Sequence, residues 1–140
     1  MKSMNVISRC QAIYRSAVLE SELSPVHHSF ILAICRAPGR SQDELARDLC
    51  LTKSTVTRAL SFLEDGGYVL RKTNPDDKRE TLVFPSEKML SVHSEIRRIA
   101  NEWNSGLTRD IGEEELAVFK SVLAKMEKNA KSLVNMEAEK

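Results

Sequence analysis

Residues 40–85 read RSQDELARDLCLTKSTVTRALSFLEDGGYVLRKTNPDDKRETLVFP and contain two helix starts followed by two strand-like runs. The first start is Ser41, which is followed three residues later by Glu44. This spacing is typical of a capping box, in which each side chain accepts a hydrogen bond from the backbone of the other residue. The apolar residues behind it recur at helical spacing: Leu45, Ala46 and Leu49. We therefore predict a short amphipathic helix that begins after Ser41.

A second helix start follows at Thr52, whose hydroxyl can cap the backbone of the next turn. The apolar residues behind it fall on one helix face: Val56, Ala59, Leu60 and Leu63. Gly66 and Gly67 supply the stop, because glycine readily adopts the backbone conformations that end a helix. The pattern predicts a helix-turn-helix, with the turn at Cys50 and Leu51.

The face of the second helix opposite its apolar stripe carries hydroxyls and a guanidinium. At about 100° per residue, this face and its flanks hold Ser54, Arg58, Ser61, Thr55 and Thr57. Short hydroxyls can approach phosphates and base edges closely, and an arginine can bond two acceptors of one guanine. This chemistry favours the major groove of duplex DNA. An ordinary solvated helix face has a similar composition and is the alternative.

Two β-prone runs follow, at residues 68–73 and 80–84, and turn-forming residues separate them. The second run alternates between two sides, with Leu82 and Phe84 on one and Thr81 and Val83 on the other. One of these sides can pack on the helices. We predict a β-hairpin whose loop projects as a wing, with cations near its stem and tip: Lys72, Lys78 and Arg79.

The wing tip combines an acidic and a basic side chain at a spacing of two. A cation at such a tip can enter the minor groove, whose narrow negative potential attracts arginine. Asp77 and Arg79 share one side of a strand-like stretch, so the carboxylate can orient the guanidinium by a charge-assisted bond. We expect Asp77 to position Arg79 rather than to contact DNA. The alternative is a polar hairpin tip with a surface ion pair.

Several short motifs occur in a fixed order along nearly the whole chain. They are Leu23-Ser24-Pro25, Leu45-Ala46, Ser54-Thr55-Val56-Thr57-Arg58, Leu63-Glu64, Gly66-Gly67-Tyr68-Val69-Leu70-Arg71 and Asp77-Lys78-Arg79. The combination resembles the MarR family of dimeric transcriptional regulators. The resemblance implies a mainly α fold with a small β-hairpin wing, a winged helix-turn-helix with N- and C-terminal dimerisation helices. The chain departs from the family where a Leu-Thr-x-x-Gly type of helix start is usual, because Ser86 stands there as the cap.

The flanking segments are expected to be helical and to hold two copies together. Residues 2–23 carry the stripe Ile7, Cys10, Tyr14 and Ala17, and Ser24-Pro25 starts the next helix, which ends at Ala37-Pro38-Gly39. After the wing, one long helix carries Met89, Val92, His93, Ile96, Ile99, Ala100, Trp103 and Leu107. A last helix carries Leu116, Phe119, Leu123, Met126, Ala130 and Leu133 at a period close to 3.5. The alternative to a homodimer is an intramolecular bundle in a monomer.

The predicted organisation has three segments: an N-terminal dimerisation helix at 1–24, a DNA-binding domain at 25–88 and C-terminal dimerisation helices at 89–140. The predicted DNA-binding residues are Ser41, Lys53, Ser54, Thr55, Thr57, Arg58, Ser61, Arg71, Lys72, Lys78 and Arg79, with Asp77 positioning the wing. Family members often bind a small amphipathic or aromatic effector between the DNA-binding unit and the dimer helices. On resemblance and helix facing, the candidate lining residues are Tyr14, His28, Ile31 and Trp103.

Charge argues against DNA binding through bulk electrostatics. The chain has 21 basic and 20 acidic residues, a formal net charge of +1 and a pI near 7.7, whereas a strongly basic pI is typical of DNA-binding domains. Between Lys53 and Arg79 there is a local excess of two cations. We therefore expect binding that depends on the placement of cations, with dimerisation doubling the basic surface.

The cysteines and histidines suggest alternatives within the same fold. Three widely spaced cysteines without a Cys-x-x-Cys pair argue against structural zinc and against a disulfide framework. Cys10, one helical turn before Tyr14, resembles the sensing region of peroxide-responsive family members, although no second tyrosine stands nearby. His27, His28 and His93 invite a metal-sensing interpretation, but adjacent histidines on a helix point in different directions. No metal or cofactor is predicted.

Enzymes are disfavoured because phosphate-binding glycine loops, His-Glu-x-x-His and nucleophile elbows are absent from the sequence. No run approaches the roughly 20 apolar residues of a membrane span, and no secretory signal is evident, so we expect a cytoplasmic protein without membrane contact. The prediction is a ligand-responsive repressor that binds a pseudo-palindromic duplex operator as a homodimer. The alternatives are a redox- or metal-sensing regulator of this fold, or a winged-helix protein-interaction module that does not bind DNA.

Overall fold

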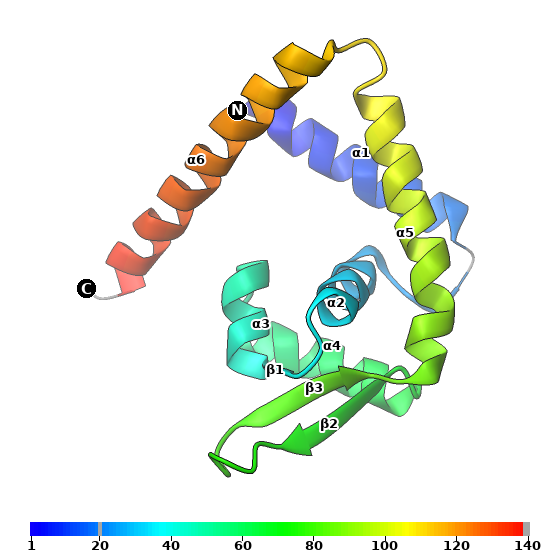
Figure 1. The fold of residues 1–140 in the computed structure, drawn as a ribbon, viewed down its shortest axis with the longest axis vertical. Coiled ribbons are helices and arrows are strands. Elements are labelled where there is room, and N and C mark those ends of the chain that lie inside the picture. Colours follow the sequence, from blue (N-terminus) through cyan, green and yellow to red (C-terminus); the bar gives the residue numbers. More distant parts are fainter. Residues whose placement is uncertain (20, 139–140) are drawn as a thin grey trace. The chain divides into compact units, whose positions relative to one another are not determined.

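The computed structural model describes residues 1–19 and 21–138 as a mainly helical chain with a small sheet (Figure 1). The elements follow the order α1 (Lys2–Val18), α2 (Pro25–Arg36), β1 (Arg40–Ser41), α3 (Gln42–Leu49), α4 (Lys53–Asp65), β2 (Val69–Thr73), β3 (Thr81–Pro85), α5 (Glu87–Leu107) and α6 (Glu113–Ala138). They form two compact units, residues 1–103 and 104–140. The predicted fold class is confirmed.

The sheet has the order β1-β3-β2 and is antiparallel throughout. Val69 pairs with Pro85 and Thr73 with Thr81, so β2 and β3 form the predicted hairpin, which projects from the helices in Figure 1. The third strand, β1, was not predicted. It has only two residues, and its Arg40 pairs with Val83 of β3. A strand of two residues is too short to show an alternating pattern in the sequence.

The core of the first unit lies between α2, α3, α4, the sheet and the first part of α5. Its buried side chains include Phe30, Ile31, Ile34, Leu45, Val56, Leu60, Leu63, Val83, Met89 and Ile96. Burial of each large apolar side chain contributes about 1.5–3 kcal/mol to stability. Of the two sides of β3, the side with Val83 faces the helices, while Leu82 and Phe84 are half-buried on the other side.

The first helix ends earlier than predicted. α1 stops at Val18, and Leu19 has an extended backbone, whereas the sequence pattern suggested a helix through residue 23. The backbone of Leu23 donates to the Ser21 hydroxyl at 3.1 Å, a local bond that competes with helix continuation. Ser24 precedes a proline and is therefore disfavoured in the helical region. Residue 20 lies outside the described residues.

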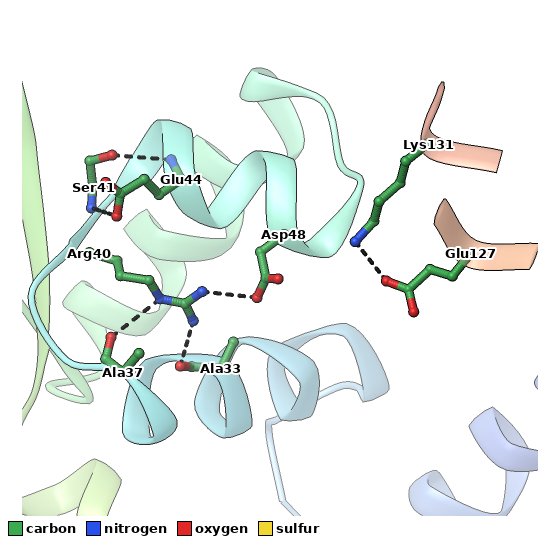
Figure 2. Close-up of polar contacts among 8 residues, drawn as sticks. All are labelled: Ala33, Ala37, Arg40, Ser41, Glu44, Asp48, Glu127 and Lys131. Atoms are coloured by element: carbon green, nitrogen blue, oxygen red, sulfur yellow. Dashed lines mark hydrogen bonds and ion pairs between the residues drawn. The ribbon is translucent and has the colours of Figure 1, made fainter. Parts of the chain in front are cut away.

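Hydroxyl side chains cap the helices where the sequence predicted. Glu44 N donates to Ser41 Oγ at 3.1 Å and Ser41 N donates to Glu44 Oε2 at 3.4 Å, which completes the capping box of α3 (Figure 2). Ser86 Oγ accepts from Met89 N at 3.2 Å and so takes the place of the threonine cap that is usual in the family and that this chain lacks.

Arg40 fixes the junction between α2 and α3. Figure 2 shows its guanidinium donating to the carbonyl oxygens of Ala33 and Ala37, at 2.7 and 3.3 Å, and to the Asp48 carboxylate at 2.9 Å. The last carbonyls of a helix lack intrahelical partners, so a cation there satisfies them and also interacts favourably with the helix dipole. Arg40 thereby holds the end of α2 against the last turn of α3.

The turn between α3 and α4 gives a stability prediction. Cys50 is in the left-handed region with φ of 54°, a conformation that favours glycine. We expect Cys50→Gly to raise the free energy of unfolding by about 0.5–1 kcal/mol, because the relief of Cβ strain exceeds the added entropy of the unfolded chain. Urea denaturation measures the change. Cys50→Ala removes the thiol but keeps Cβ, so equal stabilisation by both substitutions would contradict the explanation.

Candidate nucleic-acid interface

The N-terminus of α4 carries a cluster of hydroxyls around its cap. Thr52 Oγ1 accepts from Thr55 N at 3.2 Å and lies 2.8 Å from Thr55 Oγ1 and 3.2 Å from Ser54 Oγ. Thr57 Oγ1 donates to the carbonyl oxygen of Lys53 at 2.9 Å. A hydroxyl has one donor and two acceptor positions, so each keeps capacity for a further partner. The cluster is exposed and fixed in orientation.

The two sides of α4 separate as predicted. Val56, Ala59, Leu60 and Leu63 are buried, and Lys53, Ser54, Thr57 and Arg58 are exposed, with Thr55 and Ser61 half-buried. Lys53 Nζ lies 3.5 Å from Asp43 Oδ1, but both side chains are more than half exposed. Such a surface pair contributes only about 0–1 kcal/mol, so the ammonium can exchange this carboxylate for another anion at little cost.

The loop between β2 and β3 is held closed by its own polar groups. Asn74 binds Glu80 twice, through its backbone N–H to the carbonyl oxygen at 2.9 Å and through Nδ2 to Oε2 at 2.7 Å. Asp76 N donates to Asn74 Oδ1 at 3.0 Å, and Glu80 N donates to the carbonyl oxygen of Asp77 at 3.0 Å. Because Glu80 takes part in this closure, β3 begins at Thr81, one residue later than predicted.

Asp77 binds Arg79 at the tip of the wing. Asp77 Oδ1 accepts from Arg79 Nε at 3.2 Å and from Arg79 N at 3.1 Å. These bonds hold the pKa of the Asp77 carboxyl below its usual value, because both favour the ionised form. The Arg79 side chain is 92% exposed, so it remains available beyond the carboxylate. The contact has the geometry that a positioning role of Asp77 requires.

Two predicted DNA-contacting residues lie away from this exposed surface. Ser41 is 2% exposed and its hydroxyl caps α3, so it does not form part of the exposed surface. Arg71 makes two hydrogen bonds of 2.9 Å to Glu64 and is 23% exposed. The other two predicted wing cations, Lys72 and Lys78, are exposed. The Lys72 ammonium lies 5.2 Å from the centroid of the Phe84 ring, on the outer side of the sheet.

The four candidate effector residues are placed in two different environments. Tyr14 and Trp103 contact each other, with ring centroids 5.4 Å apart, and both are half-buried. Ile31 and His28 are inside the core, at 0 and 1% exposure. Within the described part of the chain, both ring nitrogens of His28 lack a hydrogen-bond partner. Burial lowers the pKa of His28, and the positive charges of Arg15 and of protonated His27 add to this effect.

The cysteines and histidines do not gather into a metal site. In the described ranges, no group of three or more His, Cys, Asp or Glu side chains is arranged to hold a metal ion. Cys10 is exposed, and burial raises the pKa of the Cys35 thiol. His27 stacks on Phe62 with centroids 4.3 Å apart and accepts from the backbone of Ser24 at 3.1 Å.

A polar junction at the end of α4 was missed by sequence reasoning. Tyr68 Oη donates to Glu22 Oε1 at 3.1 Å, and Lys88 Nζ donates to the carbonyl oxygen of Gly66 at 2.6 Å and lies 4.4 Å from the Tyr68 ring centroid. Ser86 Oγ donates to the carbonyl oxygen of Gly67 at 2.6 Å. Partners up to 46 positions apart leave no local signal, although the unfilled carbonyls of a helix end predict that some donor is present.

The comparisons with known proteins place this chain in a family. The MarR family model matches residues 23–81, from just before α2 to the first residue of β3. The chain is 30% identical to a MarR protein from Peptoclostridium difficile, with a TM-score of 0.78, covering 93% of this chain and 82% of that chain. The chain belongs to the MarR family. It is therefore a winged helix-turn-helix transcriptional regulator.

Other solved members of the MarR fold agree closely with this structure. A MarR family transcriptional regulator from Listeria monocytogenes, complexed with 26mer DNA, is 26% identical with a TM-score of 0.88, covering 94% of this chain and 88% of that chain. The transcriptional regulator SlyA matches at 23% identity and a TM-score of 0.87, covering 94 and 93% of the two chains, which shows the shared fold.

None of the described helices combines the length and the apolar character that crossing a bilayer requires.

The buried His28 predicts a loss of stability in acid. Its pKa is lowered in the folded state, so its stabilising contribution is complete above the unfolded-state pKa of about 6.5 and is lost progressively as the pH falls below that value and through the lower folded-state pKa. We expect His28→Leu to be more stable relative to wild type at pH 5 than at pH 8, as measured by urea denaturation. Comparing the two pH values for each protein cancels the packing change. An identical difference at both would contradict the prediction.

Proposed function

We propose that this MarR family regulator binds duplex DNA sequence-specifically as a homodimer, with α4 in the major groove and the wing beside the minor groove. The observation that carries the proposal is the pairing of two exposed and oriented groups. One is the hydroxyl-rich face of α4 with Arg58, and the other is Arg79 held by Asp77 at a projecting hairpin tip. A core or an ordinary protein-binding surface needs neither feature.

The chemistry of α4 suits groove recognition. The hydroxyls of Thr52 and Thr55 lie at the N-terminus of α4. Free backbone N–H groups and the helix dipole favour the binding of a phosphate group at such an end. Arg58, one turn further along, can donate two hydrogen bonds to a guanine edge. Lys53 is 83% exposed and can contact the sugar-phosphate backbone. The face thus combines positioning contacts with one residue able to discriminate bases.

The proposal for DNA is supported by a relative of the same fold. The Listeria monocytogenes regulator is in complex with 26mer DNA, and its match covers 94% of the present chain. Near-neutral net charge means that the present chain must rely on a few placed cations. Two copies double their number, and two half-sites one helical turn apart are the usual arrangement for a dimeric helix-turn-helix.

A second copy of the chain is the proposed partner of the terminal helices. α1 has no buried side chain, and it exposes Met4, Val6, Ile7 and Ile13 by 42% or more. In α6, apolar side chains are exposed over several turns: Val118, Phe119, Val122, Leu123, Leu133 and Val134. Extended apolar surfaces of this kind mark interaction sites. We propose that segments 1–24 and 89–140 form the dimer and that 25–88 contacts DNA.

We further propose that the regulator is a repressor whose DNA affinity is lowered by a small amphipathic or aromatic effector. The support is the contact between Tyr14 of α1 and Trp103 of α5, two half-buried aromatic rings. Aromatic side chains with one accessible side can stack on an aromatic ligand. His28 lies in the same unit and has two ring nitrogens without partners among the described residues.

Substitutions on the proposed surface give a first prediction for DNA binding. Arg58→Ala is expected to weaken binding by about 1–3 kcal/mol and to relax the base preference at one position of each half-site. Arg79→Ala is expected to lower affinity and to reduce the dependence of log K on log salt, since it loses minor-groove contacts beside phosphates. Fluorescence anisotropy with a duplex selected by the wild-type protein from a random-sequence pool measures both effects.

Lys120→Ala is the control for the DNA measurements, because it removes a cation of α6, outside the proposed surface. It should leave the affinity within about twofold of wild type, in line with the small effects of isolated surface substitutions. Wild-type affinity in both the Arg58→Ala and the Arg79→Ala proteins would show that α4 and the wing are not the DNA-binding surface.

The dimer proposal predicts a sensitive position on α6. Phe119→Glu places a charge in the apolar stripe and is expected to weaken self-association about tenfold or more, because the carboxylate would be buried without a partner. Sedimentation velocity at micromolar concentration measures the shift toward monomer. Ser121→Glu is the matched control, since it adds the same charge about 200° around the helix. A wild-type protein that sediments only as a monomer would refute the dimer.

A further inference from the structure

The side chain of Arg71 connects three elements of the winged helix. Its Nε and Nη2 donate to Glu64 Oε2 and Oε1, each at 2.9 Å, and its Nη1 donates to Gln42 Oε1 at 3.4 Å. Gln42 is the first residue of α3, Glu64 lies in the last turn of α4 and Arg71 lies in β2. One planar guanidinium therefore joins both helices of the helix-turn-helix to the first strand of the wing.

Strand alternation directs Arg71 toward the helices. Val69 is 2% exposed and Arg71, two residues later, lies on the same side of β2. Leu70 and Lys72 are on the opposite side and are exposed. The side chain of Arg71 is 23% exposed, whereas that of Arg79 is 92% exposed. The two arginines of the hairpin thus face different surroundings.

The ion pair has a specific electrostatic reason. A carboxylate in the last turn of a helix is opposed by the negative end of the helix dipole, and Glu64 occupies that position in α4. The Arg71 guanidinium compensates this effect and holds the pKa of the Glu64 carboxyl below its usual value. Two parallel N–H···O bonds also fix direction, which the single charge of a lysine does not do.

We propose that Arg71 is a positioning residue of the DNA-binding surface: through Glu64 and Gln42 it sets the orientation of the wing relative to α4, and it does not contact phosphate. The inference rests on the proposed DNA binding. Arg58 and Arg79 lie on α4 and on the wing tip, so their separation depends on the angle between the two elements. A small rotation of β2 at Arg71 produces a larger displacement at Arg79, eight residues further along the chain.

Glu64→Gln distinguishes the two roles by the sign of its effect. If Arg71 contacted phosphate, removal of the competing carboxylate would free its charge and DNA binding would become tighter. If Arg71 positions the wing, loss of the bidentate pair weakens binding, by roughly 3- to 10-fold. The measurement is the anisotropy titration with the selected duplex, made well below the thermal midpoints of all variants so that only folded protein is compared.

Asp65→Asn is the matched control. Asp65 is the next residue, is exposed and acts on Arg71 through its charge. Its substitution removes one negative charge from the same turn without removing the bidentate pair, so it reports the electrostatic effect alone. We expect binding that is unchanged or slightly tighter than wild type. The ratio between Glu64→Gln and Asp65→Asn then isolates the geometric contribution.

Arg71→Lys provides a second measurement, because lysine retains the charge but not the fork of donors. We expect it to weaken binding as much as Arg71→Gln, and we expect the Glu64→Gln/Arg71→Gln double variant to be no weaker than Arg71→Gln alone. Tighter or unchanged binding by Glu64→Gln, or wild-type binding by Arg71→Lys, would overturn the positioning role. Loss of affinity in Arg58→Ala and Arg79→Ala would show, in that case, that the DNA-binding surface itself still holds.

Discussion

Burial of the apolar stripe of α4 is the constraint on which the rest of the winged helix depends. Val56, Leu60 and Leu63 are each 1% exposed or less, so this side of the helix cannot rotate without exposing large apolar side chains to water. The fixed rotation determines which residues face outward. Arg58 and Ser54 are exposed because they lie on the side of α4 opposite the buried stripe, not because of any interaction of their own. The chemistry of the exposed side is therefore a consequence of core packing.

Packing alone does not place the wing, since a two-stranded hairpin has little core of its own. Polar contacts at both of its ends supply the missing constraints. At the base, Tyr68 donates a hydrogen bond to Glu22 and Ser86 donates one to the carbonyl oxygen of Gly67. These bonds tie the strands to the segments that flank α1 and α5.

At the tip of the wing, the hydrogen bonds of Asn74 close the loop, and Asp77 orients the Arg79 side chain. Between the base and the tip, the ion pair of Arg71 with Glu64 connects β2 to α4. The wing is thus positioned by directional bonds in addition to the burial of Val69 and Val83, and the helix by apolar burial.

The parts that the sequence predicted are those with local causes. The caps at Ser41 and Thr52 depend on residues within three positions, and the amphipathic stripe of α4 depends on its own periodicity. The unpredicted strand and the orientation of Arg71 have non-local causes. β1 exists because β3 offers it a partner, and the orientation of Arg71 depends on which side of β2 meets the helices. Strand alternation places Val69 and Arg71 on the same side of β2, so a buried Val69 implies that Arg71 points toward the helices. The sequence alone did not show which side of the strand is buried.

A transcriptional regulator with a net charge near zero must select its DNA sequence through the placement of a few contacts. Several cations of the DNA-binding unit are already bound to carboxylates, Arg40 to Asp48 and Arg71 to Glu64 among them, so they contribute order within the protein rather than attraction at a distance. Weak general attraction lowers affinity for every DNA sequence alike, because counterion release does not depend on bases. Specific contacts then make up a larger share of the total binding free energy. In the proposed binding mode the low net charge therefore favours discrimination, because a duplex that does not contact both α4 and the wing retains little electrostatic affinity.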